Sequence, residues 1–193
     1  MSVYRNVLLR AAVVFFSAII DCAGAPSCKA LEQSTSADLV SFLEGDRARL
    51  QAECINFAII SLGGQHYGPA ADVLISYLDF KDEWQKELPV SHLLWKPEYP
   101  AAQALVNIGV PATGNLIRAI GETGSSDLLR TNAEEVLLMI YRHNPPRAIA
   151  LLRASSKSAP DAITAARLFE SAIEVSRMCG LDYIRAACDA ALN

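Results

Sequence analysis

The chain has 193 residues, of which 52% are hydrophobic and 20% are charged, a composition that suits one compact domain and excludes a disordered chain. Its formal net charge is −4 and no block of lysines and arginines stands out, which argues against a nucleic-acid partner bound through its phosphates. We therefore expect one folded unit and no nucleic-acid binding.

The N-terminal region has the three parts of a secretory signal peptide. Residues 1–10 carry Arg5 and Arg10 and no acidic residue, residues 11–20 form an apolar run (AAVVFFSAII), and residues 21–25 end in small residues (DCAGA). A membrane anchor is the alternative, but ten helical residues rise only about 15 Å. That rise is about half the thickness of the hydrocarbon core of a bilayer.

We predict that residues 1–24 are removed and that the protein is exported, to the periplasm of a Gram-negative bacterium or to the extracellular space. Lipidation at Cys22 is not expected, because Asp21 stands where lipoprotein signals have a small residue. No stable membrane span then remains. Residues 25–36 are predicted to be a flexible segment that precedes a folded domain at 37–193.

The remainder of the chain predicts helices. Apolar residues recur at helical spacing, and no stretch alternates apolar and polar residues over six positions, so the fold is expected to be all-α. The helices are predicted over Ala37–Glu44, Arg47–Leu62, Pro69–Leu78, Ala101–Ile108, Pro111–Glu122, Asp127–His143, Pro145–Ala154, Pro160–Cys179 and Asp182–Ala191.

Glycines and prolines mark where these helices stop and start. Glycines that can close a last turn with a positive φ follow apolar runs at Gly63, Gly109 and Gly180. Prolines, whose missing N–H is harmless in a first turn, begin new runs at Pro69, Pro111 and Pro145. Ser158 and Asp161 fit a capping box at the next helix start. Boundaries this close together predict antiparallel helical hairpins.

Two pairs of stretches resemble each other. Residues 58–78 (AIISLGGQHYGPAADVLISYL) and 104–120 (ALVNIGVPATGNLIRAI) share an apolar helix ending in Gly, then Pro and a second helix. Residues 39–54 and 116–135 share an Arg, an Ala and a Glu at the same spacing, namely Arg49, Ala52 and Glu53 in the first and Arg130, Ala133 and Glu134 in the second. Such similarity indicates stacked repeats, each burying its apolar face on the next.

The stretch at residues 101–120 (AAQALVNIGVPATGNLIRAI), together with the Arg-x-x-Ala motif at Arg49 and Arg130, resembles the HEAT-repeat pattern. The resemblance covers most of residues 37–154. It implies a short right-handed α-α superhelix of antiparallel helix pairs, and it identifies an architecture better than an activity. The sequence departs from the pattern at residues 79–100, which are too many for a turn between paired helices.

The helix predicted over Asp127–His143 carries apolar residues around most of its circumference, so we expect neighbouring helices to cover it from two sides. Glu134 and Glu135 are adjacent on this helix and point about 100° apart, so they cannot act on one bond. We expect one of them to be solvated and the other to lie at the edge of the packing.

No catalytic or metal-binding set stands out. His66, His92 and His143 have no Cys, Asp, Glu or His at ligand spacing. Neither a nucleophile elbow nor a phosphate-binding loop occurs. We therefore predict no catalytic residue, no metal and no cofactor, and a protein that is not an enzyme.

Four cysteines follow the signal peptide: Cys28, Cys54, Cys179 and Cys188. In an oxidising compartment they allow two disulfides in any of three pairings. The setting of Cys54, at helical spacing among apolar residues, is typical of a buried thiol that need not pair. Cys179 and Cys188 flank a Gly turn and form a possible local disulfide.

The segment at residues 79–100, which we call the insertion, contains both tryptophans of the chain. Long insertions in compact domains are usually functional or mobile, and tryptophan is enriched at interface hot spots. We expect Trp95 to pack inward and Trp84, which has charged neighbours, to make an exposed contact. The candidate partner-binding residues are Trp84, Trp95, Tyr99, Arg130 and Glu134.

The favoured hypothesis is an exported helical-repeat scaffold that binds a protein or peptide partner without catalysis. One alternative is an enzyme or small-ligand carrier with a pocket between helices near the insertion, lined by Trp84, His92, Trp95 and Tyr99. A structural helper of a larger envelope assembly is a third possibility.

Overall fold

The computed structural model describes residues 28–81, 96 and 98–178, and every regular element among them is a helix. This confirms the all-α prediction. The α-helices are α1 (Ser36–Leu43), α2 (Ala52–Gly64), α3 (Ala71–Ile75), α4 (Pro100–Ile108), α5 (Thr113–Gly121), α6 (Asp127–Ile140), α7 (Pro145–Lys157) and α8 (Ala162–Met178). Short 3-10 helices are η1 (Cys28–Gln33), η2 (Arg47–Arg49), η3 (Gly68–Ala70) and η6 (Val110–Ala112). The helix predicted over Asp182–Ala191 lies outside the described residues.

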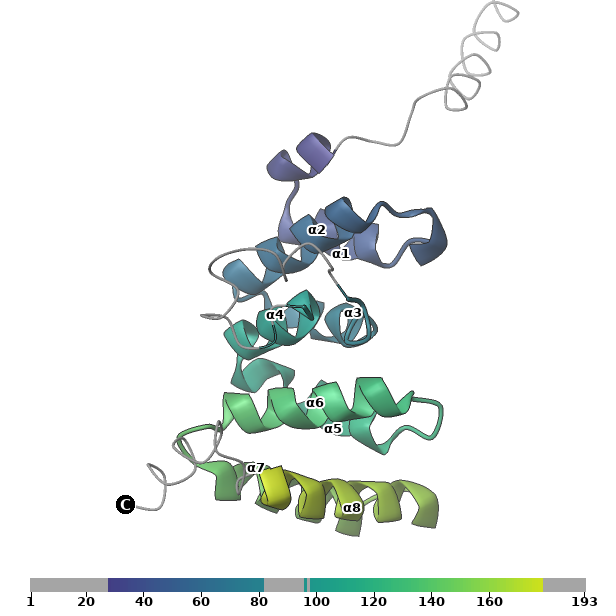
Figure 1. Cartoon of the computed structure of the whole chain (residues 1–193), viewed down its shortest axis with the longest axis vertical. Helices are drawn as coiled ribbons and strands as arrows, with labels where there is room; N and C mark the ends of the chain where they lie inside the picture. The colour runs from purple at the N-terminus through teal and green to yellow at the C-terminus, as the bar shows by residue number, and fades with distance from the viewer. Residues whose placement is uncertain (1–27, 82–95, 97, 179–193) are drawn as a thin grey trace, which may run out of the picture.

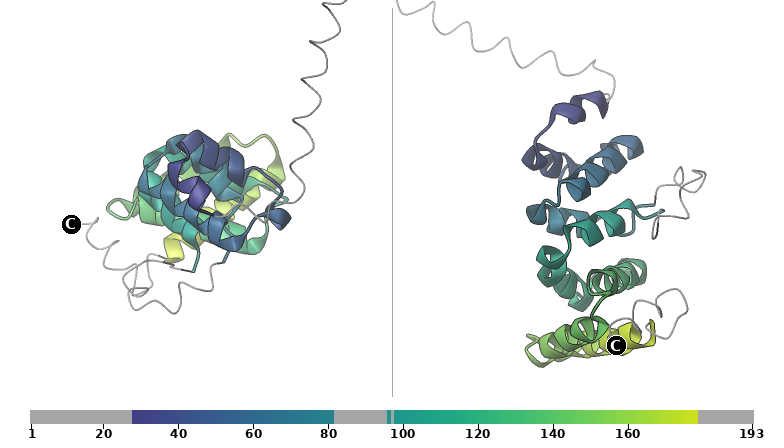
Figure 2. Two further views of the ribbon diagram at one scale, coloured as in Figure 1. Left: turned by 90° about the horizontal axis from the view of Figure 1, so that it is seen from above. Right: turned by 90° about the vertical axis from the view of Figure 1, so that its left-hand side faces the viewer.

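The helices stack in layers along the long axis of the molecule (Figure 1). The pairs α1/α2, α3/α4, α5/α6 and α7/α8 form successive layers, and the two helices of each pair contact each other. Between layers, α2 contacts α4 and α4 contacts α6, while α3 contacts α5 and α5 contacts α8 (Figure 2). A continuous apolar core therefore runs through the stack between these helices.

Local signals account for several helix ends. Thr35 caps α1, because its hydroxyl accepts the N–H of Asp38 while the Asp38 carboxylate accepts the N–H of Thr35 at 3.0 Å. The predicted prolines begin the short 3-10 helices η3 and η6 and the helix α7. Gly109 has a φ of 75°, as predicted. At the start of α8 the predicted capping box of Ser158 and Asp161 is wrong, because Asp161 alone accepts the N–H groups of residues 163 and 164.

The prediction that Gly63 ends a helix with a positive φ is wrong. Helix α2 continues to Gly64, and the positive φ of 50° falls at His66. The reason that Gly63 has no side chain is a close helix contact, since a Cβ there would lie 2.6 Å from the Cα of Ala104 in α4. Gly63 thus allows the backbones of α2 and α4 to approach each other.

The first pair of similar stretches has the same order of elements. Residues 58–78 and 104–120 each form a helix, a 3-10 turn that contains Pro, and a second helix. Equivalent positions are buried in both, among them Ala58, Ile59, Leu62, Leu74 and Leu78 in the first and Ala104, Leu105, Ile108, Leu116 and Ile120 in the second. The two similar stretches therefore share an order of elements and a set of buried positions.

The second pair of stretches is less alike. Arg49 lies in η2 and Ala52 is exposed at the start of α2, whereas Ala133 is fully buried within α6. The Arg-x-x-Ala motif therefore occupies a helix interior only in the second stretch.

Helix α6 is covered on several sides, as predicted. It contacts α4, α5, α7 and α8, and every residue from Asn132 to Leu138 is buried. Polar side chains on this stretch must therefore find partners inside the protein.

A disulfide joins Cys28 in η1 to Cys54 in α2. Cys54 is buried, as predicted, but it is bonded rather than a thiol. Residues 28–33, within the segment expected to be flexible, form η1, and the disulfide links them to α2. Cross-links of this kind typically contribute about 2–4 kcal/mol to stability. Cys179 and Cys188 lie outside the described residues.

We expect Gly63→Ala to lower the free energy of unfolding by about 1–3 kcal/mol, because the added methyl group would collide with the backbone of Ala104. Gly64→Ala is the matched control: a Cβ there meets no atom within 4 Å. Removing a helical glycine should leave this control unchanged or raise its stability by up to about 1 kcal/mol. Urea denaturation followed by circular dichroism measures both, and equal effects would contradict the close contact.

Candidate functional site

The insertion leaves the stack after α3 and returns at the start of α4. The structure describes its two ends, residues 79–81 at the start and residues 96 and 98–100 at the return. Side chains from other elements hold both ends. We call this set the insertion base; it consists of Arg47, Tyr77, Asp79, Phe80, Lys96, Tyr99, Asn132, Glu135 and the carbonyl group of Leu78.

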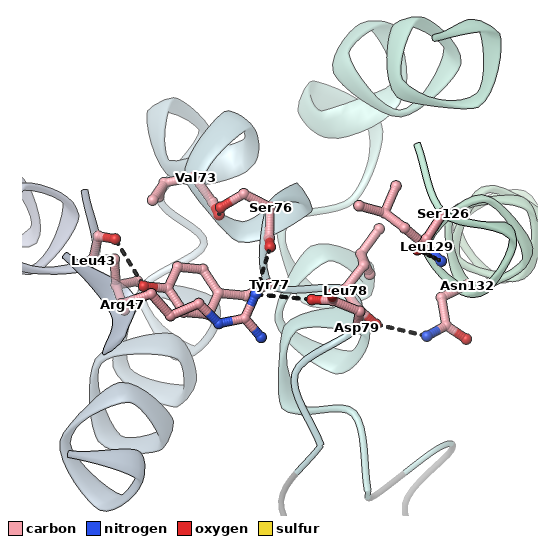
Figure 3. Close-up of polar contacts among 10 residues, drawn as sticks. All are labelled: Leu43, Arg47, Val73, Ser76, Tyr77, Leu78, Asp79, Ser126, Leu129 and Asn132. Carbon is pink, nitrogen blue, oxygen red and sulfur yellow. Dashed lines mark hydrogen bonds and ion pairs between the residues drawn. The ribbon is translucent and has the colours of Figure 1, made fainter. Parts of the chain in front are cut away.

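Arg47 of η2 holds the start of the insertion. Its Nη1 lies 3.0 Å from Oδ1 of Asp79 and donates to the carbonyl of Ser76 at 3.3 Å (Figure 3). The same guanidinium lies over the rings of Tyr77 and Phe80, at 4.7 and 5.7 Å from their centres. A planar cation that combines an ion pair with ring stacking fixes orientation better than a flexible ammonium group would.

Tyr77 packs against the guanidinium of Arg47 and is itself fixed by a hydrogen bond. Its ring is buried, and its hydroxyl donates to the carbonyl of Leu43 at 2.8 Å. Burial raises the pKa of Tyr77 above its ordinary value, and the nearby charge of Arg47 opposes this shift. The phenol therefore stays neutral as a hydrogen-bond donor at physiological pH.

Asn132 of α6 connects both ends of the insertion. Its Nδ2 donates to the carbonyl of Leu78 at 2.6 Å, and its Oδ1 accepts from Nζ of Lys96 at 2.6 Å. The side chain of Asn132 is fully buried, so these bonds form away from water. One amide thus fixes the residue before the insertion and a residue near its return.

Lys96 is held by a second contact on α6. Its Nζ lies 2.9 Å from Oε2 of Glu135, and the two side chains are only 20% and 11% exposed. Lys96 also has a φ of 49°, a conformation that is uncommon for residues other than glycine. Its ammonium group lies 5.3 Å from the ring centre of Tyr99. Removing one member of a buried ion pair is costly, so this return point is strongly fixed.

A groove borders the insertion base between α3, α5 and the connection from α5 to α6. It encloses about 570 Å³, and we call it the α3–α5 groove. Its floor is apolar at Ile75, Ala119 and Leu129, and its rim carries the carboxylates of Asp72, Asp79 and Glu122 and the guanidinium of Arg118. Figure 3 shows Ser76 and Asp79 at one side of this region and Ser126 and Leu129 at the other.

Arg118 fixes the rim of the α3–α5 groove. It makes ion pairs with Asp72 and, at 3.1 Å, with Glu122. Asn115 donates to the Asp72 carboxylate at 2.7 Å. The rim is therefore a set of charges in defined positions around an apolar floor, an arrangement that suits recognition of a polar segment of another molecule.

The structure separates the predicted partner-binding residues into two places. Tyr99 lies in the insertion base, half-buried against the core, directly before α4. Arg130 and Glu134 line a different groove, of about 420 Å³, between α6 and α8. Trp84 and Trp95 lie outside the described residues, as does His92.

The prediction that either Glu134 or Glu135 is solvated is wrong, since both side chains are buried. The cause is the enclosure of α6 by helices on several sides. Oε1 of Glu134 accepts from Oγ of Ser171 in α8 at 2.5 Å. Burial raises the pKa of Glu134 above its ordinary value, while the hydrogen bond from Ser171 and the charge of Arg130 act in the opposite direction.

The sequence did not predict that four residues of the insertion base come together. These are Arg47, Lys96, Asn132 and Glu135. One signal was present: Asn132 is a polar residue within an apolar helix face, and such residues need internal partners. The partners themselves lie far away in the sequence, so no local pattern identifies them.

Within the described ranges, no group of three His, Cys, Asp or Glu side chains is placed to hold a metal ion. No helix among the described residues is long and apolar enough to cross a membrane. No protein-family model, curated protein or solved structure matches this chain.

We expect Asn132→Ala to lower the free energy of unfolding by about 2–4 kcal/mol, because it leaves the buried carbonyl of Leu78 and the ammonium of Lys96 without this partner. The amide of Phe80, which donates to the carbonyl of Tyr77, should also exchange hydrogen faster. Gln103→Ala is the control, because it removes an exposed amide contact within α4. If the two variants unfold at the same urea concentration, the hydrogen bonds of Asn132 do not stabilise the two ends of the insertion.

We expect Glu134→Gln to change how stability depends on pH. A raised pKa in the folded state means that Glu134 contributes stability below its ordinary pKa of 4.5, which is lost as pH rises through the folded value. The wild type should therefore become progressively less stable relative to the variant above about pH 4.5. Chemical denaturation across pH 3–8 measures this difference. Glu170→Gln, which makes the same change at an exposed position beside the same groove, is the matched control.

Proposed function

We propose that this protein is an exported, non-enzymatic helical-repeat scaffold that binds a protein or peptide partner through the insertion and the adjoining α3–α5 groove. The insertion base carries this proposal. Arg47 from η2 holds the start of the insertion, Glu135 from α6 holds its return, and Asn132 from α6 contacts both ends. Buried polar side chains of α6 contact both ends of the insertion, which fixes its two ends on the helical stack.

The layered helices support a HEAT-like architecture. Consecutive layers bury apolar faces on each other, and the unit at residues 58–78 is used again at 104–120 with equivalent positions buried. A right-handed superhelix of this kind would present the insertion and the groove on one edge of a rigid support. Binding segments displayed on rigid supports lose less conformational entropy when they bind.

Two features support export. The N-terminal sequence has the order of a signal peptide, and Cys28 is bonded to Cys54. Structural disulfides form and persist in oxidising compartments and are rare in the cytosol. The periplasm or the extracellular space is therefore the proposed location.

The chemistry of the site favours a polypeptide partner. The α3–α5 groove is bordered by charged and hydroxyl groups, and small-molecule pockets are usually lined mainly by apolar and aromatic side chains. In the insertion, Trp84 stands among charged residues, the composition expected of an anchor with a polar rim.

Affinity capture from the native cell envelope tests the proposal. The wild-type chain should recover a protein partner that Trp84→Ala recovers at least about tenfold less well, because central aromatic anchors dominate binding energy. Phe169→Ala is the control, since it removes an exposed aromatic side chain from α8, away from the insertion.

Equal recovery by wild type and Trp84→Ala would show that the insertion is not the binding element. Recovery of a small molecule in place of a protein would favour a ligand carrier. Unchanged melting temperatures for both variants would show that lost capture is not lost folding.

A further inference from the structure

Positive charge is concentrated near one end of this acidic chain. Residues 136–160 contain four lysines and arginines and no acidic residue, although the whole chain has a net charge of −4. Three of the four, Arg147, Arg153 and Lys157, lie on α7. With α8, this helix forms the layer farthest from α1 and α2 in the described stack (Figure 1).

The cations of α7 share one property, the absence of a carboxylate partner among the described residues. Arg147, Arg153 and Lys157 are exposed and make no ion pair with any described residue. Several cations elsewhere do pair with carboxylates, as in Arg47–Asp79, Lys96–Glu135, Arg118–Glu122, Arg130–Asp127 and Arg177–Glu174. Lys29 and Arg142 resemble the α7 cations in having no ion pair with a described residue, but α7 alone among the described helices carries three such cations. The first carboxylate after α7, Asp161, accepts hydrogen bonds at the start of α8.

A groove of about 570 Å³ runs along α7 and reaches Ser176 of α8. Ala150 and Ala154 form part of its lining, with Arg153 and Lys157 beside them. These four residues have the spacing of one helix face. The small alanine side chains allow a partner to approach the helix closely, and the two cations stand one turn apart along it.

We propose that this α7 face, defined by Ala150, Arg153, Ala154 and Lys157, is a second docking surface that binds an acidic, amphipathic segment of a partner protein. Carboxylates one helical turn apart on the partner match the spacing of Arg153 and Lys157. Apolar residues between them match the alanine floor. A hollow with an apolar floor fits one segment better than it fits a flat lipid surface.

The rest of the molecule favours this choice of partner. The chain is acidic overall, so an acidic segment is repelled by other surfaces and attracted to the α7 face. Helix α7 also lies in a different layer from α3 and α4, the helices between which the insertion begins and ends (Figure 1). This docking surface is therefore independent of the partner proposed for the insertion.

A titration of the full chain with a labelled synthetic peptide tests the proposal. The peptide carries Glu at every fourth position with Leu and Ala between, and its matched counterpart carries Gln in place of Glu. We expect the acidic peptide to bind, the Gln peptide to bind at least about tenfold more weakly, and binding to weaken several-fold between about 50 and 200 mM salt.

The variants locate the binding. Arg153→Gln with Lys157→Gln should lower the affinity about tenfold, the order expected from two exposed ion pairs. Lys29→Gln with Arg49→Gln is the matched control, because it removes the same charge from exposed positions in η1 and η2. Arg153→Glu with Lys157→Glu should lose the acidic peptide and gain a peptide with Lys in place of Glu.

Three results would overturn the proposal. The acidic and Gln peptides bind equally, or the two Gln double variants lose affinity equally, or the charge-reversed variant keeps its preference for the acidic peptide. Vesicles of phosphatidylglycerol and phosphatidylcholine provide a further arm. If the vesicles bind through Arg153 and Lys157 while the peptide does not, the surface recognises anionic lipid and the proposed protein partner is wrong.

Discussion

The enclosure of α6 is the constraint on which much of the structure depends. Its buried stretch from Asn132 to Leu138 includes one amide and two carboxylates, which cannot remain inside a protein without partners. Asn132 and Glu135 find theirs at the two ends of the insertion, and Glu134 finds its partner in Ser171 of α8. The burial of one helix therefore fixes a surface segment on one side and the last described helix on the other.

The sequence was a good guide where the cause of a feature is local. Prolines begin elements because of their own geometry, and Gly109 takes a positive φ because the chain turns there. Gly63 was misinterpreted because its requirement comes from Ala104 on another helix. The bond between Cys28 and Cys54 was one of several pairings that the sequence left open.

The candidate site was harder to predict for the same reason. Tyr99 was named as a candidate because aromatic residues in a long insertion stand out in a sequence. Arg47 and Asn132 act on residues 32 and 54 positions away, so their roles appear only when the layers are assembled. Glu134 and Glu135 were expected to be one solvated acid and one acid at the edge of the packing, because the helices on several sides of α6 cannot be foreseen from the sequence.

The hydrogen bonds of Asn132 also imply an order in which parts of the chain fold. Its contacts with Leu78 and Lys96 span 54 and 36 residues of the chain, so the two ends of the insertion cannot be joined before α6 exists and has packed. Contacts this far apart in sequence form late in folding compared with the turns of single helices. The insertion base therefore forms only in a chain whose helices have packed through α6. A chain that is still unfolded, or that stops short of α6, cannot present the insertion in this fixed position to a partner.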